Sequence, residues 1–165
     1  MRQTQVTVRR TRAADLEAFE AFVAGLSVET STKRFFVPTS RLPRPHARLL
    51  LANDHRRGSF VAAVGGCVVA HGCWVAVTPE VAEMALVVAD TAQRRGVGRR
   101  LVRALLRDMQ DAGIRDMEMV VEPGNRTVVD LIHRSWPDST PRTEDGLLMF
   151  VTPVATRAEE SRAVA

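Results

Sequence analysis

The chain contains 165 residues, 45% of them hydrophobic and 25% charged, and carries a net charge of +4 from 23 basic and 19 acidic residues. This length supports one well-packed core and is short for two, so we expect a single domain over residues 1–153 and a flexible tail over residues 154–165. The basic excess is small and dispersed, without an aromatic-interleaved basic ribbon, which speaks against nucleic acid as a partner. No stretch approaches the roughly 18 apolar residues of a membrane span, so we expect a cytoplasmic protein that does not bind membranes.

Two cysteines, Cys67 and Cys73, lie in one apolar, strand-like segment with five residues between them. This spacing is neither that of a zinc site nor that of a disulfide framework. We therefore expect two buried, reduced thiols, no disulfide and no metal site.

The first part of the chain predicts one strand and two helices. These are a strand over residues 5–9, an amphipathic helix over 15–26 and a second, shorter helix over 27–36. We expect Phe35 and Phe36 to anchor the second helix in the core. Three prolines break the next segment into a loop. Within this loop, residues 41–45 are either a mobile segment over a substrate site or a plain connection.

The rest of the chain predicts five further strands, one further extended piece and two helices. Paired glycines mark a hairpin turn, and Asn125 stands at the start of the last helix as a candidate N-cap. The predicted elements are strands over 59–64, 67–77, 81–89, 115–121 and 147–151, helices over 97–111 and 125–136, and an extended piece before Glu144. The order β-α-α-β-β-β-α-β-α-β-β predicts an α/β (α+β) fold with a mixed central sheet of about six to seven strands and helices on both faces.

The stretch from Gln93 to Gly98 links an apolar strand to a helix through a tight turn. The first turn of a helix has unpartnered backbone N–H groups and partial positive charge, so it binds anions. Gly96 and Gly98 would let a ligand approach the backbone closely, and four arginines surround the turn: Arg94, Arg95, Arg99 and Arg100. Guanidinium groups suit phosphate, so we expect a phosphate-bearing ligand. The alternative is an ordinary helix start with its arginines in solvent.

The spacing Gln-x-x-Gly-x-Gly at this turn resembles the pyrophosphate-binding signature of the GNAT superfamily of acyl-CoA-dependent N-acyltransferases. The turn lacks the Lys-Ser/Thr pair of a Walker P-loop and is not Gly-x-Gly-x-x-Gly. The order of elements over residues 5–152 also resembles the GNAT fold. Residues 26–36 and 82–93 further resemble bacterial protein-lysine acetyltransferases.

This resemblance implies that acetyl-CoA is the cosubstrate. In the family, the pantetheine arm pairs with the fourth strand, here Leu86, Val87 and Val88, and a backbone N–H, here that of Val88, would polarise the thioester carbonyl. The resemblance places the pyrophosphate on the turn and the first helical turn: Gln93, Arg94, Arg95, Gly96, Val97, Gly98, Arg99 and Arg100. Asn125 matches the family's asparagine that touches the CoA arm, although an N-cap role alone would also account for it.

The harder partner in such a transfer is the amine. A free lysine has a pKa of about 10.4, so making it neutral at pH 7 costs about 4.6 kcal/mol. A carboxylate near the thioester would remove that proton, directly or through water. Glu83 interrupts an apolar strand and matches the general-base glutamate of the related lysine acetyltransferases, although a surface carboxylate would look the same. Glu80 is the reserve candidate and reads as a turn residue.

Many GNAT enzymes protonate the leaving thiolate with a tyrosine, and this sequence contains no tyrosine. The matching position is near Ile132, and the adjacent His133 is a weak substitute. His71, in the strand with the two cysteines, reads as a packing or hydrogen-bonding residue.

We therefore expect an acetyl-CoA-dependent N-acetyltransferase that works by direct attack of a primary amine, preferably a protein lysine. The sequence contains no nucleophile motif such as Gly-x-Ser-x-Gly, which speaks against a covalent acyl-enzyme. Two alternatives stay open: an acetyltransferase for a small amine such as a polyamine or aminoglycoside, and a non-catalytic acyl-CoA-binding sensor or partner domain. The sequence leaves a monomer and a homodimer equally open.

Overall fold

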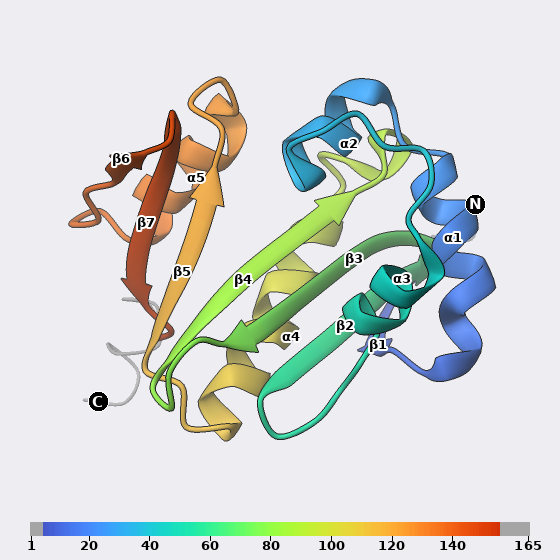
Figure 1. Ribbon diagram of the computed structural model, residues 1–165, viewed down its shortest axis with the longest axis horizontal. Helices are drawn as coiled ribbons and strands as arrows, with labels where there is room; N and C mark the ends of the chain where they lie inside the picture. The colour runs from blue at the N-terminus through green and yellow to red at the C-terminus, as the bar shows by residue number, and fades with distance from the viewer. Residues whose placement is uncertain (1–4, 156–165) are drawn as a thin grey trace.

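A seven-stranded sheet runs through the protein in the order β1-β2-β3-β4-β5-β7-β6. The structure is a computed structural model that describes residues 5–155. All neighbouring strands are antiparallel except β4 and β5, which are parallel. Helices cover both faces (Figure 1). The predicted fold class is confirmed.

The elements follow the predicted order with one addition. The strands are β1 (Val6–Arg10), β2 (Arg57–Val64), β3 (Cys67–Ala76), β4 (Val81–Val88), β5 (Asp116–Val121), β6 (Arg142–Glu144) and β7 (Leu147–Pro153). The helices are α1 (Leu16–Ala24), α2 (Val28–Phe35), α3 (Arg44–Leu50), α4 (Val97–Asp111) and α5 (Arg126–Ser135), with short 3-10 turns η1 (Ala13–Asp15) and η2 (Asp90–Ala92). The hairpin turn between β2 and β3 is made by Gly65 and Gly66, both at positive φ, as the paired glycines predict.

The core lies on both faces of the sheet. On one face, α4 and α5 pack on the apolar side chains of the central strands, and this cluster contains most of the large buried residues, among them Leu101, Leu105 and Met117. On the other face, α1 and α3 enclose a smaller cluster around Phe19 and Val23. Figure 1 shows α1, α2 and α3 over only one half of this second face, which leaves the half formed by β5 and β7 without a helix.

A buried polar contact fastens α4 to the sheet. Asp108 of α4 is 7% exposed. It accepts a hydrogen bond from Trp74 Nε1 at 2.8 Å and an ion-paired hydrogen bond from Arg10. A buried carboxylate needs such partners to offset the loss of its hydration. Gly58 lies next to this contact, and a Cβ atom there would collide with Asp108 Oδ2 and Trp74 Nε1.

Three local predictions are wrong. The proline-broken loop contains a helix, α3, because Pro45 occupies its first turn, where a missing N–H costs nothing. Phe36 does not anchor α2: it caps the helix in the left-handed conformation, φ 60°, and is 42% exposed. Cys67 is exposed at the hairpin, whereas Cys73 is partly buried.

At the C-terminus, packed structure passes the predicted domain boundary. Val154 is 1% exposed, and its N–H donates to the carbonyl of Arg115 at 2.8 Å. Of the predicted flexible tail, residues 156–165 lie outside the described residues. Between residues 5 and 155, no helix is long and apolar enough to cross a membrane, and no group of three or more His, Cys, Asp or Glu side chains is placed to hold a metal ion.

Candidate active site

The parallel strands β4 and β5 pair over only part of their length. Their register consists of three pairs, Val81 with Asp116, Ala82 with Met117 and Glu83 with Glu118. Beyond these pairs the two strands diverge (Figure 1), whereas β3 accompanies β4 from Ala82 to Val88. The second half of β4 therefore has one edge without a partner strand in the described part of the chain.

The hydrogen-bond alternation shows which backbone groups face this open edge. The carbonyl of Val81 accepts from Val77 at 2.8 Å, and the N–H of Ala89 donates to Val69 at 2.8 Å. Odd-numbered residues of β4 thus direct their N–H and C=O groups to the β3 side, and even-numbered residues direct theirs to the opposite side. The N–H groups of Leu86 and Val88 consequently face the open edge, while the backbone of Val87 is bonded toward β3. Leu86 and Val88 are donors available to a ligand.

The glycine turn ends beside the same half of β4. Gly96 is the N-cap of α4 at φ 76°, and α4 begins without a side-chain cap and without an acidic residue in its first turn. The N–H groups at this end therefore keep their capacity to bind an anion. Gly98 lies against the end of the strand, with its Cβ position 3.5 Å from Val88 Cγ2. Val97, between the glycines, is buried and anchors the turn to the core.

Three of the four predicted phosphate-binding arginines are available to a ligand. Arg94, Arg95 and Arg99 are exposed, and within the described chain no hydrogen bond or ion pair holds their guanidinium groups. Arg94 also has a positive φ of 58°, a conformation that costs a non-glycine residue energy. Arg100 differs, because its Nη1 donates to the carbonyl of Val6 in β1 at 3.2 Å.

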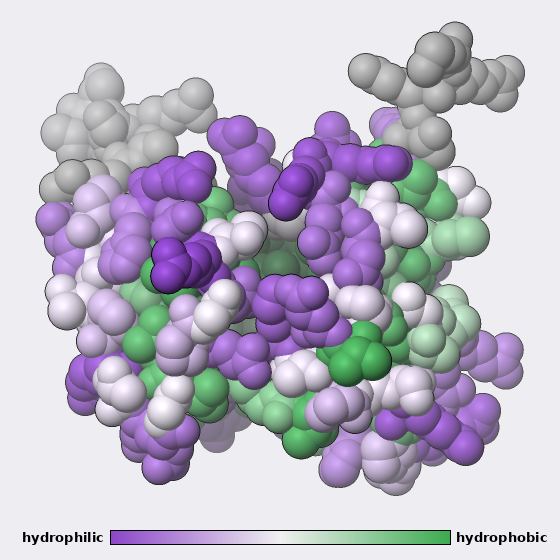
Figure 2. Space-filling model, turned by 90° about the horizontal axis from the view of Figure 1, so that it is seen from above, coloured by the Kyte–Doolittle hydropathy of each residue, from purple (hydrophilic) through white to green (hydrophobic). Residues whose placement is uncertain are grey.

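Figure 2 looks onto this end of the molecule and shows a hollow with an apolar floor and a rim of hydrophilic side chains. The end of β4, the open edge and the start of α4 meet at this end (Figure 1). The hollow is where a ligand could reach both the unpaired strand edge and the helix N-terminus.

Gln93 is positioned differently from a simple phosphate ligand. Its side-chain Nε2 donates to the backbone carbonyl of Val88 at 3.1 Å and lies 3.4 Å from Thr30 Oγ1. Both hydrogens of the amide are therefore directed at protein atoms.

Asn125 stands at the N-cap position of α5 as predicted, but its side chain makes no capping hydrogen bond. Its backbone carbonyl accepts from Val128 and Val129, both at 3.1 Å. The interpretation of Asn125 as a side-chain cap is therefore wrong, and its partly exposed amide is available for another role.

Glu83 lies in β4, next to the half of the second face that no described helix covers. Its side chain is exposed, and no hydrogen bond or ion pair engages it among residues 5–155. Paired residues share a face of the sheet, so the register forms one row across four strands: Val75, Glu83, Glu118 and Val151. Val75 and Val151 are 46% and 43% exposed. Two carboxylates on adjacent strands, flanked by exposed valines, make this an acidic surface open to a cationic partner.

The reserve candidate Glu80 has a structural role. Its carbonyl accepts from Arg115 at 2.8 Å and from Asp116 at 3.1 Å, and its carboxylate lies 3.8 Å from Arg115 Nε. Glu80 therefore connects the start of β4 to the start of β5, and Glu83 stays the better candidate for a base.

Neither Cys73 nor His71 is a good catalytic group. Burial raises the pKa of the Cys73 thiol, and Arg34 Nη2, which donates to its sulfur at 3.7 Å, offsets this only in part, so the nucleophilic thiolate is scarce. Burial lowers the pKa of His71 to about 3, with Arg34 as a smaller cause. His71 Nε2 lies 3.0 Å from Ser59 Oγ and 3.1 Å from the Leu50 carbonyl, which confirms its predicted packing role.

The position of the family's tyrosine offers no replacement acid. Ile132 is 2% exposed within the core. His133 is exposed at the next position, and its ring packs edge-on against Phe150 at a centroid distance of 5.6 Å.

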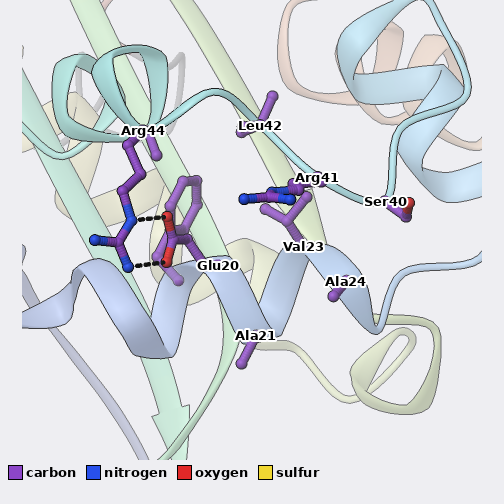
Figure 3. A pocket seen from close by; sticks show the side chains of 10 residues that line it. Glu20, Ala21, Val23, Ala24, Ser40, Arg41, Leu42 and Arg44 are labelled. Carbon is purple, nitrogen blue, oxygen red and sulfur yellow. Dashed lines mark hydrogen bonds and ion pairs between the residues drawn. The ribbon is translucent and has the colours of Figure 1, made fainter.

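A cavity of about 480 Å³ lies away from these residues, between α1 and the segment that precedes α3. Figure 3 shows Arg41 pointing into it and Arg44 paired with Glu20 across its edge; the Arg44 Nε to Glu20 Oε1 distance is 3.2 Å. Arg41, Leu42 and Arg44 thus line one wall of this cavity.

Sequence reasoning missed a polar cluster that joins α2 to the glycine turn. The carboxylate of Asp90 accepts from the Ser27 hydroxyl at 2.8 Å, from the Ser27 N–H at 3.1 Å and from the Thr30 hydroxyl at 2.7 Å. The bond from Thr30 is the largest cause that lowers the pKa of Asp90 to about 2. Ser27 also caps α2 by accepting from Thr30 N–H at 3.1 Å. The cap was visible in the sequence as Ser27 before a helical pattern, whereas its link to Asp90 was not.

The chain belongs to the acetyltransferase (GNAT) family, because residues 25–135 match the model of that family. GNAT acetyltransferases use acetyl-CoA, so the protein is an acetyl-CoA-dependent acetyltransferase. Among curated proteins, no match is found.

Solved structures agree with this family. The GNAT domain of S. lividans PAT, a bacterial protein acetyltransferase, is 26% identical, with a TM-score of 0.81 and 90% of each chain covered. A GNAT-family acetyltransferase from Streptococcus pneumoniae is 15% identical, with a TM-score of 0.75 and coverage of 90% of this chain and 99% of that one. The Salmonella typhimurium protein yncA, solved with acetyl-CoA, is 17% identical, with a TM-score of 0.67 and coverage of 92% and 95%.

Proposed function

We propose that this enzyme transfers the acetyl group of acetyl-CoA to the side-chain amine of a protein lysine, with Glu83 as the general base. The observation that carries this proposal is the position of Glu83. Among the described residues, its exposed carboxylate has no partner, and the far half of its strand presents two backbone donors that no described strand binds. One strand would therefore serve both substrates: Glu83 on the open face would deprotonate the amine, and the donors on the open edge would bind acetyl-CoA.

The residues of the open edge fit acetyl-CoA. The N–H groups of Leu86 and Val88 that face this edge can donate to the amide carbonyls of a pantetheine arm, as they would to a partner strand. The uncapped start of α4 at Gly96, Val97 and Gly98, with Arg94, Arg95 and Arg99 around it, suits a pyrophosphate. The side-chain amide of Asn125, which makes no capping hydrogen bond, would contact the CoA arm from the start of α5. When bound, acetyl-CoA supplies an activated thioester.

The chain's own residues would then act on the amine and on the developing charge. Glu83 would accept the proton of the lysine ammonium, directly or through a water molecule, so that the neutral amine can attack. The N–H of Val88 would donate to the carbonyl oxygen as negative charge builds on it. As the C–N bond to the lysine replaces the C–S bond of the thioester, CoA would leave as a thiolate; a thiol pKa of about 8.5 lets it depart without a dedicated acid. The scarcity of thiolate at Cys73 supports direct transfer over a covalent acyl-enzyme.

A protein acceptor fits the surface around Glu83 better than a small amine does. Glu83 and Glu118 lie on an exposed face between Val75 and Val151, whereas the described cavity lies at α1 on a different part of the molecule. An open face with apolar flanks can receive a lysine that protrudes from a folded partner, and the second carboxylate favours a cationic side chain. The similarity to the GNAT domain of a bacterial protein acetyltransferase supports the same class.

The test is acetyl transfer followed by mass spectrometry. Wild type and Glu83→Gln would each receive isotopically labelled acetyl-CoA with a mixed pool of proteins, polyamines and aminoglycosides. We expect label on discrete protein lysines with wild type and little label with Glu83→Gln. Label on polyamines or aminoglycosides only would replace the protein acceptor by a small amine. No transfer by wild type despite acetyl-CoA binding would overturn the proposal and favour a non-catalytic sensor.

A further inference from the structure

Four side chains form a continuous polar network from α2 to the end of β4. Ser27 and Thr30 of the α2 N-terminus donate to Asp90, Gln93 Nε2 lies 3.4 Å from the Thr30 hydroxyl, and the same nitrogen donates to the Val88 carbonyl at 3.1 Å. Thr30 is the central member, because its hydroxyl donates its own hydrogen to Asp90 and can still accept one from Gln93. The network therefore ends on the backbone of the residue whose N–H faces the open edge.

The bond from Gln93 completes the anchoring of the peptide group between Val88 and Ala89. At one end of this planar group, the Ala89 N–H donates to the Val69 carbonyl of β3 at 2.8 Å. At the other end, the Val88 carbonyl accepts from Gln93. The preceding peptide group is held to β3 through Val87, by the same alternation that directs the Val88 N–H outward. The Val88 N–H itself lies in the preceding plane, so Gln93 acts on it through Val88. With the following plane also held, φ and ψ of Val88 are restricted, and the end of the strand cannot twist there and turn the N–H away from the open edge.

We infer that Gln93 is a positioning residue that orients the Val88 N–H for the oxyanion, supported by Thr30 and Asp90, and that it is not a ligand of the pyrophosphate. This inference rests on the proposed function of Val88. It reverses the role that the Gln-x-x-Gly-x-Gly resemblance assigns to the side chain of this position. It also makes α2, through Thr30, part of the apparatus that holds the oxyanion donor.

Two variants separate the two roles. Gln93→Leu removes the donor at similar size, and Gln93→Glu replaces it by a carboxylate that would repel both the Val88 carbonyl and a phosphate. An orienting role predicts a fall in kcat of about tenfold, less than the loss of a whole oxyanion donor, with the Kd for CoA in calorimetry changed by less than about twofold. A phosphate-binding role predicts a Kd for CoA raised at least about tenfold, most in Gln93→Glu.

Further variants at Gln93 and Thr30 distinguish a loss of orientation from a general loss of structure. Gln93→Arg keeps N–H donors on a side chain of sufficient reach and should restore most of kcat. Thr30→Val removes the hydroxyl at equal size and should lower kcat in the same direction as Gln93→Leu, whereas Thr30→Ser keeps the hydroxyl and should retain activity. All variants should keep the wild-type midpoint of thermal unfolding to within a few degrees, because these hydrogen bonds are solvent-exposed and contribute about 1 kcal/mol or less each.

The kinetics are measured on the acceptor that the labelling experiment identifies. Wild type that acetylates this acceptor, with Gln93→Leu equal to it in kcat, would overturn the inference and leave the proposed function standing. Weakened CoA binding with unchanged kcat would also overturn it and return Gln93 to the phosphate site. Absence of transfer by wild type would instead overturn the proposed function itself.

Discussion

The two halves of β4 belong to one apolar run, which Glu83 interrupts, and they have different surroundings. From Val81 to Glu83 the strand is paired on both sides, with β3 and with β5. From Leu86 to Val88 it is paired with β3 alone among the described strands, because β5 diverges from it (Figure 1). The first half is therefore a central strand and the second half is an edge strand within the same sheet.

This contrast separates stability from binding along one strand. In the paired half, backbone groups bond to other strands, so changes there act on folding. In the unpaired half, two N–H donors have no partner among residues 5–155. They therefore do not stabilise the free enzyme and can bind a ligand. Glu83 stands at the boundary, at the last residue paired with β5. Substitutions at the boundary, at the opening and far from both test this division.

The largest effect is expected at that boundary. Glu83→Gln should lower kcat by about 10²- to 10⁴-fold, the range of general-base catalysis, because the amide cannot accept the ammonium proton. The thermal midpoint should change little, since the Glu83 side chain is exposed and without a partner in the described structure. Steady-state kinetics with differential scanning calorimetry checks both.

The matched control for this variant is Glu80→Gln. Glu80 is an exposed glutamate three positions earlier that pairs with Arg115 at the surface, so its loss should change kcat by less than about twofold. Equal losses in the two variants would show that general surface charge, and not a base at Glu83, carries the activity.

A substitution far from the opening should have the opposite effect: it should lower stability and leave kcat nearly unchanged. In Gly58→Ala, the new Cβ would collide with Asp108 and Trp74 and disrupt the hydrogen bond that fastens α4 to the sheet. We expect a loss of about 3 kcal/mol in the free energy of unfolding from overpacking and the weakened buried contact. Urea unfolding measures this loss. At a temperature where the variant is folded, kcat should stay within about threefold of wild type, and a selective loss of kcat would contradict the division.

The pH dependence of stability should report the buried His71. Its pKa is lowered to about 3 from 6.5, chiefly by burial and also by Arg34, while a hydrogen bond to the Leu50 carbonyl opposes the shift. The unfolded chain therefore binds a proton below pH 6.5 that the folded protein does not accept. Stability from the neutral ring is complete above pH 6.5 and is lost as the pH falls toward 3, by about 1.4 kcal/mol per pH unit.

Urea unfolding between pH 6.5 and 5 tests this slope before carboxylates contribute. In the same range, NMR of the imidazole should show His71 neutral at pH 5. A protonated His71 in the folded protein at pH 5 would contradict the assignment of this ring to the core.

The smallest stability change is expected at Gly98. The same variant tests whether this glycine is needed for close approach of a pyrophosphate or only for packing. Its Cβ position is in ordinary contact distance of Val88, and alanine favours a helix over glycine by about 0.5–1 kcal/mol, so Gly98→Ala should stabilise the free enzyme by that amount. If the backbone here approaches a pyrophosphate, the methyl group should also weaken acetyl-CoA binding by about tenfold or more. Unchanged affinity would leave only a packing role for Gly98.

Local patterns predicted much of the fold, and they also suggested the candidate site. The strand, glycine turn and helix around Gly96 form a continuous segment, so their arrangement follows from residues near one another in the chain. Glu83 was recognisable because a charge interrupts an apolar run. The hairpin at Gly65 and Gly66 was equally local, since only the turn geometry had to be satisfied.

The remaining features depend on contacts between distant segments. The pairing of Glu83 with Glu118 follows from the register of β4 and β5, which no local pattern specifies. The link from Gln93 to Thr30 joins the turn to a helix from the first quarter of the chain. The helix α3 was missed for a different reason, because Pro45 breaks a helix interior but is tolerated in a first turn.

The most direct test of the account is hydrogen exchange of individual β4 amides by NMR, with and without acetyl-CoA. The amides of Leu86 and Val88 should exchange fast in the free enzyme and slow by about tenfold or more when acetyl-CoA is bound. The amides of Ala85 and Val87, bonded to β3, should be protected in both states. Unchanged exchange at Leu86 and Val88 under saturating acetyl-CoA would contradict the central claim that the unpaired half of β4 holds the cosubstrate.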